Sequence, residues 1–264
     1  MTTPPSTTPA ATESDGIPSV AAADHSAGAK PGVFLTAEWR NLLMVNFAVD
    51  RSVLEPLVPA GTELDLWQGR TYVSVVGFRF LNTRVRGIPV PFHRNFDEVN
   101  LRFYVRRRIG DEWRKGVAFV KEIVPRRAIA FVARALYNEN YVRMPMRSSV
   151  TVPGKVRYEW RHAGAWEGVS ATVVGEAYRA ETSSEETFIT EHYWGYARQR
   201  DGSTVEYAVE HEPWRVWRCE DPAFACQVVR LYGEAFAPFL ANRPISAFVA
   251  DGSAVVVRKG VRLR

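Results

Sequence analysis

Alternation of side chains between Glu98 and Arg108 is the feature that most constrains the fold of this chain. A period of two is typical of a β-strand, because successive side chains point to opposite faces. Gly110 follows in a turn, and Lys115–Val124 is expected to be the return strand of a hairpin. One face of the first strand would carry Val99, Leu101, Phe103 and Val105, and the other Glu98, Asn100, Arg102, Tyr104 and Arg106.

Further strands and short helices are expected along the rest of the chain. Residues 39–49 are apolar enough for a strand covered on both faces. A hairpin over 64–81 would turn at Gln68–Gly69, an irregular loop would fill 82–96, and a last hairpin would turn at Asp251–Gly252. Other strands are predicted at 141–152, 155–161, 168–179 and 204–211.

Helices are predicted after Asp50, after Pro125, from Ser183 to Trp194 and over 224–236. Ser52 with Glu55, and Ser183 with Glu186, have the spacing of capping boxes. Helices interspersed with hairpins favour an α+β fold built mainly from antiparallel β-sheets.

Composition indicates one globular domain behind an N-terminal tail. The chain has 264 residues, of which 46% are hydrophobic, enough to bury a sizeable core. Residues 1–32 are rich in Thr, Pro, Ala and Ser, so we expect a disordered tail followed by a single domain over 33–264. No signal peptide is apparent, and no apolar run reaches the roughly 20 residues that a membrane helix needs. We therefore expect a cytoplasmic protein.

Charge and cysteine content suggest few special partners. The net charge is +5, and its densest cluster is Arg106–Arg108, which is either a solvated hairpin end or a phosphate-binding patch. A nucleic-acid partner is thus a minor possibility. Cys219 and Cys226 fit neither a redox motif nor a zinc ribbon, so we expect reduced thiols rather than a disulfide.

Common catalytic motifs are absent from the sequence. It contains no GxGxxG, Walker A, HExxH or GxSxG pattern. His93, His192 and His211 are the candidates for a metal site, but histidines at this density are usually structural. We expect no metal and no other cofactor.

Several polar side chains have positions that suit a ligand site. Glu98, Asn100 and Arg102 share one strand face, so they line either one cavity or a solvated surface. Arg40 abuts an apolar strand, where it either lies at an exposed end or holds an acid in a pocket. Arg134 is a candidate anion clamp or a surface ion pair. Trp214 is a candidate pocket wall or a core residue.

Several motifs follow one another along the chain: Trp39–Leu43, Gly69–Ser74, Phe78–Gly87, Glu98–Arg102 with Tyr104–Val105, Ala133–Arg134 with Leu136–Tyr137, and His211–Trp214. In this order they resemble the YqjF-like domain-of-unknown-function family, which is grouped with the acetoacetate decarboxylase-like superfamily. The resemblance covers about residues 34–257. It implies a cone-like barrel of curved antiparallel sheets around a central cavity, with a few helices packed outside.

The resemblance also raises the question of a catalytic lysine. Acetoacetate decarboxylases form a Schiff base through a lysine whose pKa a second lysine lowers, with an arginine and a glutamate assisting. Arg40 aligns with that arginine, but Tyr141 and Val142 stand where the two lysines are expected. The assisting glutamate has no match near Thr83 and Arg84. Lys121 is the remaining alternative nucleophile.

The sequence therefore predicts a cavity that binds a small anionic or oxo-acid metabolite. Arg40, Asn100, Arg102, Arg134 and Trp214 are the predicted binding residues. Any reaction would be lyase-like acid/base chemistry by Glu98 or Tyr141, without an imine. The alternative is a non-catalytic sensor, and a homo-oligomer is possible.

Overall fold

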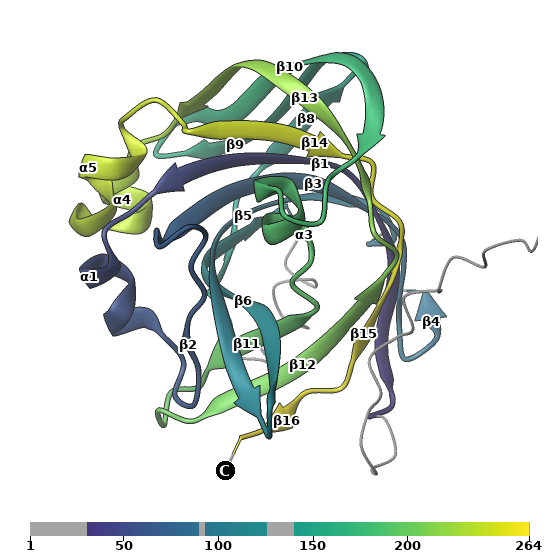
Figure 1. The fold of residues 1–264 in the computed structure, drawn as a ribbon. Helices are drawn as coiled ribbons and strands as arrows, with labels where there is room; N and C mark the ends of the chain where they lie inside the picture. The colour runs from purple at the N-terminus through teal and green to yellow at the C-terminus, as the bar shows by residue number, and fades with distance from the viewer. Residues whose placement is uncertain (1–30, 90–92, 126–139, 264) are drawn as a thin grey trace, which may run out of the picture. The chain divides into compact units, whose positions relative to one another are not determined.

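Strands dominate the residues that this computed structural model describes, which are 31–89, 93–125 and 140–263 (Figure 1). The strands are β1 (Val33–Ala48), β2 (Glu63–Leu64), β3 (Tyr72–Val85), β4 (Ile88–Pro89), β5 (Phe96–Ile109), β6 (Glu112–Val124), β7 (Tyr141–Arg143), β8 (Met146–Val150), β9 (Gly154–His162), β10 (Ala165–Arg179), β11 (Trp194–Arg198), β12 (Thr204–His211), β13 (Arg215–Ala225), β14 (Ser246–Ala250), β15 (Ala254–Arg258) and β16 (Val261–Arg262). The short helices are α1 (Arg51–Leu54), η1 (Glu55–Leu57), α3 (Glu185–Thr190), α4 (Val228–Tyr232), η2 (Glu234–Phe236) and α5 (Ala237–Leu240).

The long strands curl into a closed ring. Pairing runs β3–β5–β6–β11–β12–β15–β1, and β1 pairs back to β3 along its other edge. All of these pairs are antiparallel except β6–β11. The ring closes at β1, which pairs with β15 along one edge and with β3 along the other. Figure 1 shows α3 within the opening that the ring surrounds.

A second layer of strands covers one side of the ring. β14, β13, β10, β9 and β8 continue the sheet from β1 and fold back over β1, β3 and β5. One apolar cluster fills the space between the layers and includes Leu43, Leu101, Phe103, Tyr158 and Trp160. A second cluster lies inside the ring. These strands are therefore buried on both faces, which explains the continuous apolar run in β1.

The predicted alternation of β5 is confirmed. Val99 and Leu101 pack between the layers, whereas Glu98 and Asn100 face the inside of the ring. The fold class, α+β with mainly antiparallel curved sheets, is also confirmed. Strand predictions for 141–152, 155–161, 168–179 and 204–211 correspond to β7 to β10 and β12.

Other predictions about local structure were wrong. The 64–81 hairpin has its predicted turn, with a Trp67–Arg70 bridge, but β2 pairs with β5 instead of β3. The loop predicted over 82–96 begins with strand, because β3 continues to Val85 and turns at Arg86–Gly87 into β4.

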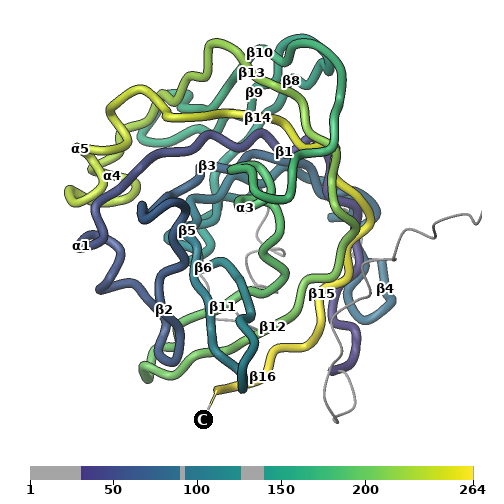
Figure 2. Tube along the Cα trace, in the orientation of Figure 1, coloured from purple at the N-terminus to yellow at the C-terminus, as the bar shows by residue number. Residues whose placement is uncertain are grey.

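The prediction of a hairpin that turns at Asp251–Gly252 was also wrong. β14 and β15 lie end to end along the same edge of β1, with partners Leu42–Ala250 and Glu38–Ala254 (Figure 2). They pair with β1 and not with each other, so the Asp-Gly pair interrupts one line of pairing and does not reverse the chain.

The first residues and N-caps of the helices differ from the predictions. Asp50 caps α1 without a side-chain hydrogen bond, and the Ser52–Glu55 capping box does not form. Ser184, not Ser183, caps α3 by accepting a 3.2 Å hydrogen bond from the backbone N–H of Thr187. The helix predicted over 224–236 starts inside β13, an unpredicted strand, and becomes helical only at α4.

Two predictions lie outside the described residues: most of the tail, and the helix after Pro125. The division into tail and domain stays a prediction. Both cysteines are free thiols. Within 31–89, 93–125 and 140–263, no helix has the length and apolar character needed to cross a membrane.

Candidate functional site

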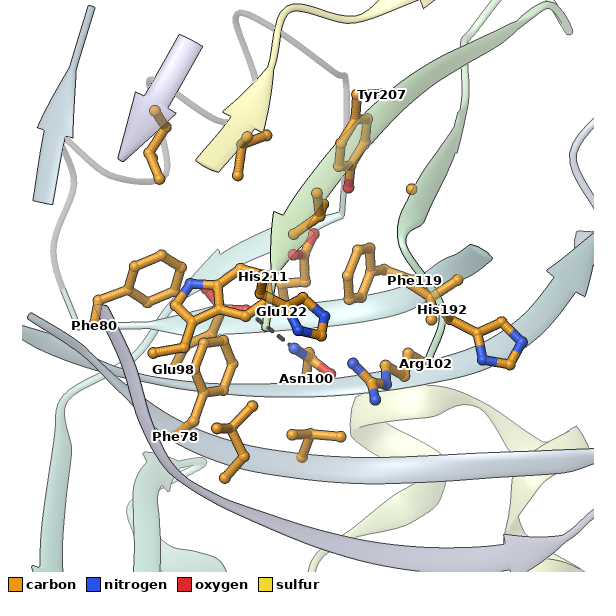
Figure 3. A pocket seen from close by; sticks show the side chains of 18 of the residues that line it. Phe78, Phe80, Glu98, Asn100, Arg102, Phe119, Glu122, His192, Tyr207 and His211 are labelled. Carbon is orange, nitrogen blue, oxygen red and sulfur yellow. Dashed lines mark hydrogen bonds between the residues drawn. The ribbon is translucent and has the colours of Figure 1, made fainter. Parts of the chain in front are cut away.

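A cavity of about 130 Å³ lies inside the ring, and every strand of the ring contributes to its lining (Figure 3). Its aromatic wall includes Trp39, Phe78, Phe80, Phe96, Phe119 and Trp214. Its polar groups include Glu98, Asn100, Arg102, Glu122, His192 and His211. An apolar pocket with a few convergent polar groups is the usual form of a small-molecule site.

β5 supplies a row of three polar side chains to this cavity. Glu98 and Asn100 are each 3% exposed and Arg102 is 9% exposed. The Nδ2 atom of Asn100 donates a 3.1 Å hydrogen bond to Glu98 Oε1, which orients the carboxylate. The Oδ1 atom of Asn100 has no partner among the described residues. The structure thus brings three predicted site residues together, and their roles stay predictions.

Arg102 is a buried cation with no carboxylate partner among the described residues. Its Nη2 donates a 3.1 Å hydrogen bond to the carbonyl oxygen of Ile189, at the end of α3, and lies 4.0 Å from the sulfur of Met44. Its Nε is buried and has no hydrogen-bond partner there. A buried charge is costly unless it is paired, so an anion bound beside Arg102 would stabilise this arrangement.

Glu122 on β6 is a second buried carboxyl group in the cavity, and it is 2% exposed. The sequence prediction missed it. Regular alternation from Phe119 would place Lys121 inside the ring and Glu122 outside. A bulge at Val120 reverses these faces, because Arg102 pairs with Phe119 while Leu101 pairs with Lys121. Glu122 therefore lies opposite Asn100.

His192 and Asp65 form a buried pair at the edge of the cavity. His192 Nε2 lies 3.1 Å from Asp65 Oδ2, and both side chains are almost fully buried. Burial lowers the pKa of His192, despite the hydrogen bond to Asp65. Burial opposes a low pKa for Asp65, but His192, Lys115 and Arg106 outweigh it and lower that pKa. A neutral imidazole therefore donates to a carboxylate, and its Nδ1 has no partner among the described residues.

Trp214 and Tyr141 both line the cavity, as His211 does. His211 stacks on Trp214 with ring centroids 4.1 Å apart, and burial lowers the pKa of His211 to about 4. Trp214 Nε1 donates to Ser253 Oγ at 2.9 Å, which fixes the indole in the wall. Tyr141 on β7 pairs with Glu122 on β6. The sequence singled out Trp214 and Tyr141 but gave no reason to place His192 and His211 beside them.

Arg40 does not line the cavity, which corrects its predicted place in the binding site. Its side chain is 39% exposed, pairs with Glu38 at 2.7 Å and donates to the carbonyl oxygen of Gly252 at 3.1 Å. The cause is a bulge in β1, where Asn41 has a φ of 56°. Trp39 and Leu42 point into the cavity on either side of this bulge. Arg134 lies outside the described residues.

No lysine lines the cavity among the residues that the structure describes. The two internal segments outside this part, 90–92 and 126–139, contain no lysine in their sequence. Lys121, the alternative nucleophile, points to the other side of β6, where its Nζ donates to the carbonyl oxygen of Leu231. Burial lowers the pKa of Lys121. Among the residues that the structure describes, no amine is therefore in place to form a Schiff base with a cavity ligand.

The basic cluster on the β5–β6 hairpin is paired with carboxylates. Arg106 lies 2.7 Å from Glu63, and Arg107 lies 3.1 Å from Glu206. Arg108 lies 3.5 Å from Asp111. These pairs fit the solvated hairpin end better than a phosphate patch. Across 31–89, 93–125 and 140–263, no group of three or more His, Cys, Asp or Glu side chains could hold a metal ion.

Comparisons with known proteins agree with this architecture. The model of the DUF2071 family, described as an uncharacterized conserved protein, matches residues 36–254. The uncharacterized protein YqjF of Bacillus subtilis (strain 168) is 29% identical over 190 residues, which are 69% of this chain and 74% of YqjF.

Solved structures show the same fold. Acetoacetate decarboxylase from Legionella pneumophila has a TM-score of 0.63 at 10% identity, over 93% of each chain. The enduracididine biosynthesis enzyme MppR complexed with pyruvate has a TM-score of 0.60 at 14% identity, over 90% of this chain and 93% of MppR. The predicted resemblance is therefore confirmed at the level of family and fold.

Proposed function

Since this chain belongs to the DUF2071 family and has the fold of acetoacetate decarboxylase-like enzymes, we propose that its cavity binds a small carboxylate-bearing metabolite through Arg102. The observation that carries this proposal is the buried Arg102 guanidinium, which has no carboxylate partner among the described residues. Guanidinium groups bind carboxylates strongly when both are desolvated.

An oxo acid fits the other polar groups of the cavity. Its carboxylate would pair with Arg102, and a hydroxyl or enol group would donate to Asn100 Oδ1. The bound pyruvate in MppR gives a precedent for such a ligand in this fold. In this assignment Arg102 takes the role that the sequence gave to Arg40.

Chemistry on such a ligand would be proton transfer. In this proposal Glu98, whose carboxylate accepts a hydrogen bond from Asn100, would act as the base, and Tyr141, which also lines the cavity, as the acid. Loss or gain of a proton next to the oxo group needs no covalent bond to the protein. The second candidate function is a non-catalytic sensor of the same acid, which is favoured because none of the described lysines lines the cavity.

Calorimetric titration and thermal shift with a panel of oxo and hydroxy acids test the proposal. A ligand at about 100 times its Kd adds about 2.7 kcal/mol to the free energy of unfolding. Arg102→Gln should weaken binding by about 10- to 100-fold, because a charge-assisted hydrogen bond contributes roughly 1.5–3 kcal/mol. The matched control is Arg108→Gln on the same strand, which pairs with Asp111 and lies outside the cavity.

Unchanged binding in Arg102→Gln would refute the proposal. Proton NMR of the bound acid in deuterated buffer separates the two functions. Exchange or product formation that is lost in Glu98→Gln identifies an enzyme. Tight binding without either identifies a sensor.

A further inference from the structure

We infer that the ligand of this cavity is a carboxylic acid that carries a single aromatic ring, and not a short aliphatic oxo acid. This inference rests on the proposed binding of a carboxylate by Arg102. It depends on three observations: a continuous aromatic wall, the volume of the cavity, and the separation of that wall from the cation.

The aromatic wall is a connected series of ring contacts. Phe96 stacks on Phe80 at 4.5 Å, and Phe80 lies 5.1 Å from Phe78. Trp39 meets Phe78 edge-on at 5.4 Å and Trp214 at 6.4 Å. Such edges and faces are the surfaces that another aromatic ring contacts best. A purely polar three-carbon acid would leave this wall without a ligand partner.

The cavity volume suits one ring. The cavity is about 130 Å³, close to the roughly 150 Å³ of an apolar cavity known to bind benzene. The wall also offers one donor, because Trp39 Nε1 is buried and has no partner among the described residues.

The Arg102 guanidinium and the aromatic wall lie at different positions along the strands of the ring. Phe78 pairs with Glu98, and Ser74 pairs with Arg102, so four residues of β5 separate the two positions. That spacing corresponds to roughly 13 Å along the strand, part of which the Arg102 side chain spans. Figure 3 shows Phe78 and Phe80 at the opposite end of the labelled group from Arg102 and His192. A ligand that contacts both ends therefore needs a ring attached to its acid group.

Matched pairs of acids test the inference by calorimetric titration of the full chain. Phenylpyruvate is compared with pyruvate, and phenylacetate with acetate. We expect each aromatic acid to bind at least 10-fold more tightly than its aliphatic partner. This ratio is measured in the unmodified protein and does not depend on how any variant folds.

Variants locate the ring. Phe78→Leu should weaken phenylpyruvate binding by at least 5-fold and leave pyruvate binding unchanged, because only the aromatic acid reaches this side chain. The control is Phe224→Leu, which removes an aromatic ring that packs between the layers and not in the cavity. Phe224→Leu should leave both affinities unchanged.

The outcomes separate this inference from the proposed function. Equal affinities for phenylpyruvate and pyruvate, both lost in Arg102→Gln, would overturn the inference and keep the carboxylate site. Binding of neither acid, or binding that Arg102→Gln does not weaken, would overturn both.

Discussion

Arg40 and Arg102 show that the groups around an arginine side chain decide whether its charge is available to a ligand. Arg40 has Glu38 at 2.7 Å and is partly exposed, so its charge is already compensated. Arg102 is buried against the carbonyl oxygen of Ile189, with no carboxylate in reach among the described residues. The sequence predicted the inward direction of Arg102 from alternation. It could not predict the partner of Arg40, which depends on a bulge.

His211 should make the stability of the protein depend on pH. Its folded pKa of about 4 lies below the ordinary value of 6.5, so between these values the unfolded chain binds a proton that the folded chain does not. The free energy of unfolding should therefore fall as the pH falls through this window, and be unaffected by His211 above it. His211→Phe keeps a ring against Trp214 and removes the titration.

Urea unfolding of both proteins at pH values of about 7, 5.5 and 4.5 checks this prediction. The loss of stability between the first and last pH should be smaller in His211→Phe. Some loss should remain, because burial also lowers the pKa of His192. Identical losses in the two proteins would contradict the assignment to His211.

At the scale of elements, periodicity predicts a strand but not an interruption of it. The alternation in β5 was readable because no bulge breaks the run from Glu98 to Arg102. β1 and β6 each contain a bulge, and beyond it the side chains exchange faces. For this reason the sequence placed Arg40 in the site and missed Glu122.

The junction between β14 and β15 gives a test at this scale. A Cβ atom on Gly252 would lie 1.9 Å from the backbone oxygen of Trp39, and Gly252 has a φ of 79°. Gly87 has the same φ, but nothing lies within 4 Å of its Cβ position. Gly87→Ala should cost about 1 kcal/mol from backbone strain alone. Gly252→Ala should cost about 2 kcal/mol more, because the steric clash adds to that strain.

Chemical denaturation of the two variants measures the difference in the free energy of unfolding. Equal losses would show that β1 yields easily at the bulge. They would contradict a close contact between Gly252 and Trp39.

For the whole molecule, the fold follows from strands that are buried on both faces. Apolar runs in β1 and β3 need a cover on each side, which the inside of the ring and the second layer provide. The sequence predicted buried strands, and the family resemblance predicted the cone-like architecture. Neither could predict that β2 pairs with β5, or that β14 and β15 share one edge of β1, because these pairings join distant segments.

The positions of the lysines lead to a prediction for the whole chain. Sodium borohydride traps an imine as a stable amine, so treatment with pyruvate or phenylpyruvate reveals a reactive lysine. We expect the intact mass to stay unchanged, because none of the described lysines lines the cavity. Lys121→Ala is the control variant. An adduct on wild type that is absent from this variant would show that Lys121 reaches a ligand after all.

The bulge at Val120 also bears on how such cavities can change in evolution or by design. Lys121 and Glu122 are adjacent, and one unpaired residue before them selects which of the two side chains faces the cavity. A shift of the β5–β6 hydrogen-bond register by one residue would thus exchange a carboxylate for an amine in the cavity, with no change in amino-acid composition. A designer seeking an amine-bearing relative would begin with Glu122→Lys, which places the new side chain directly across from Asn100.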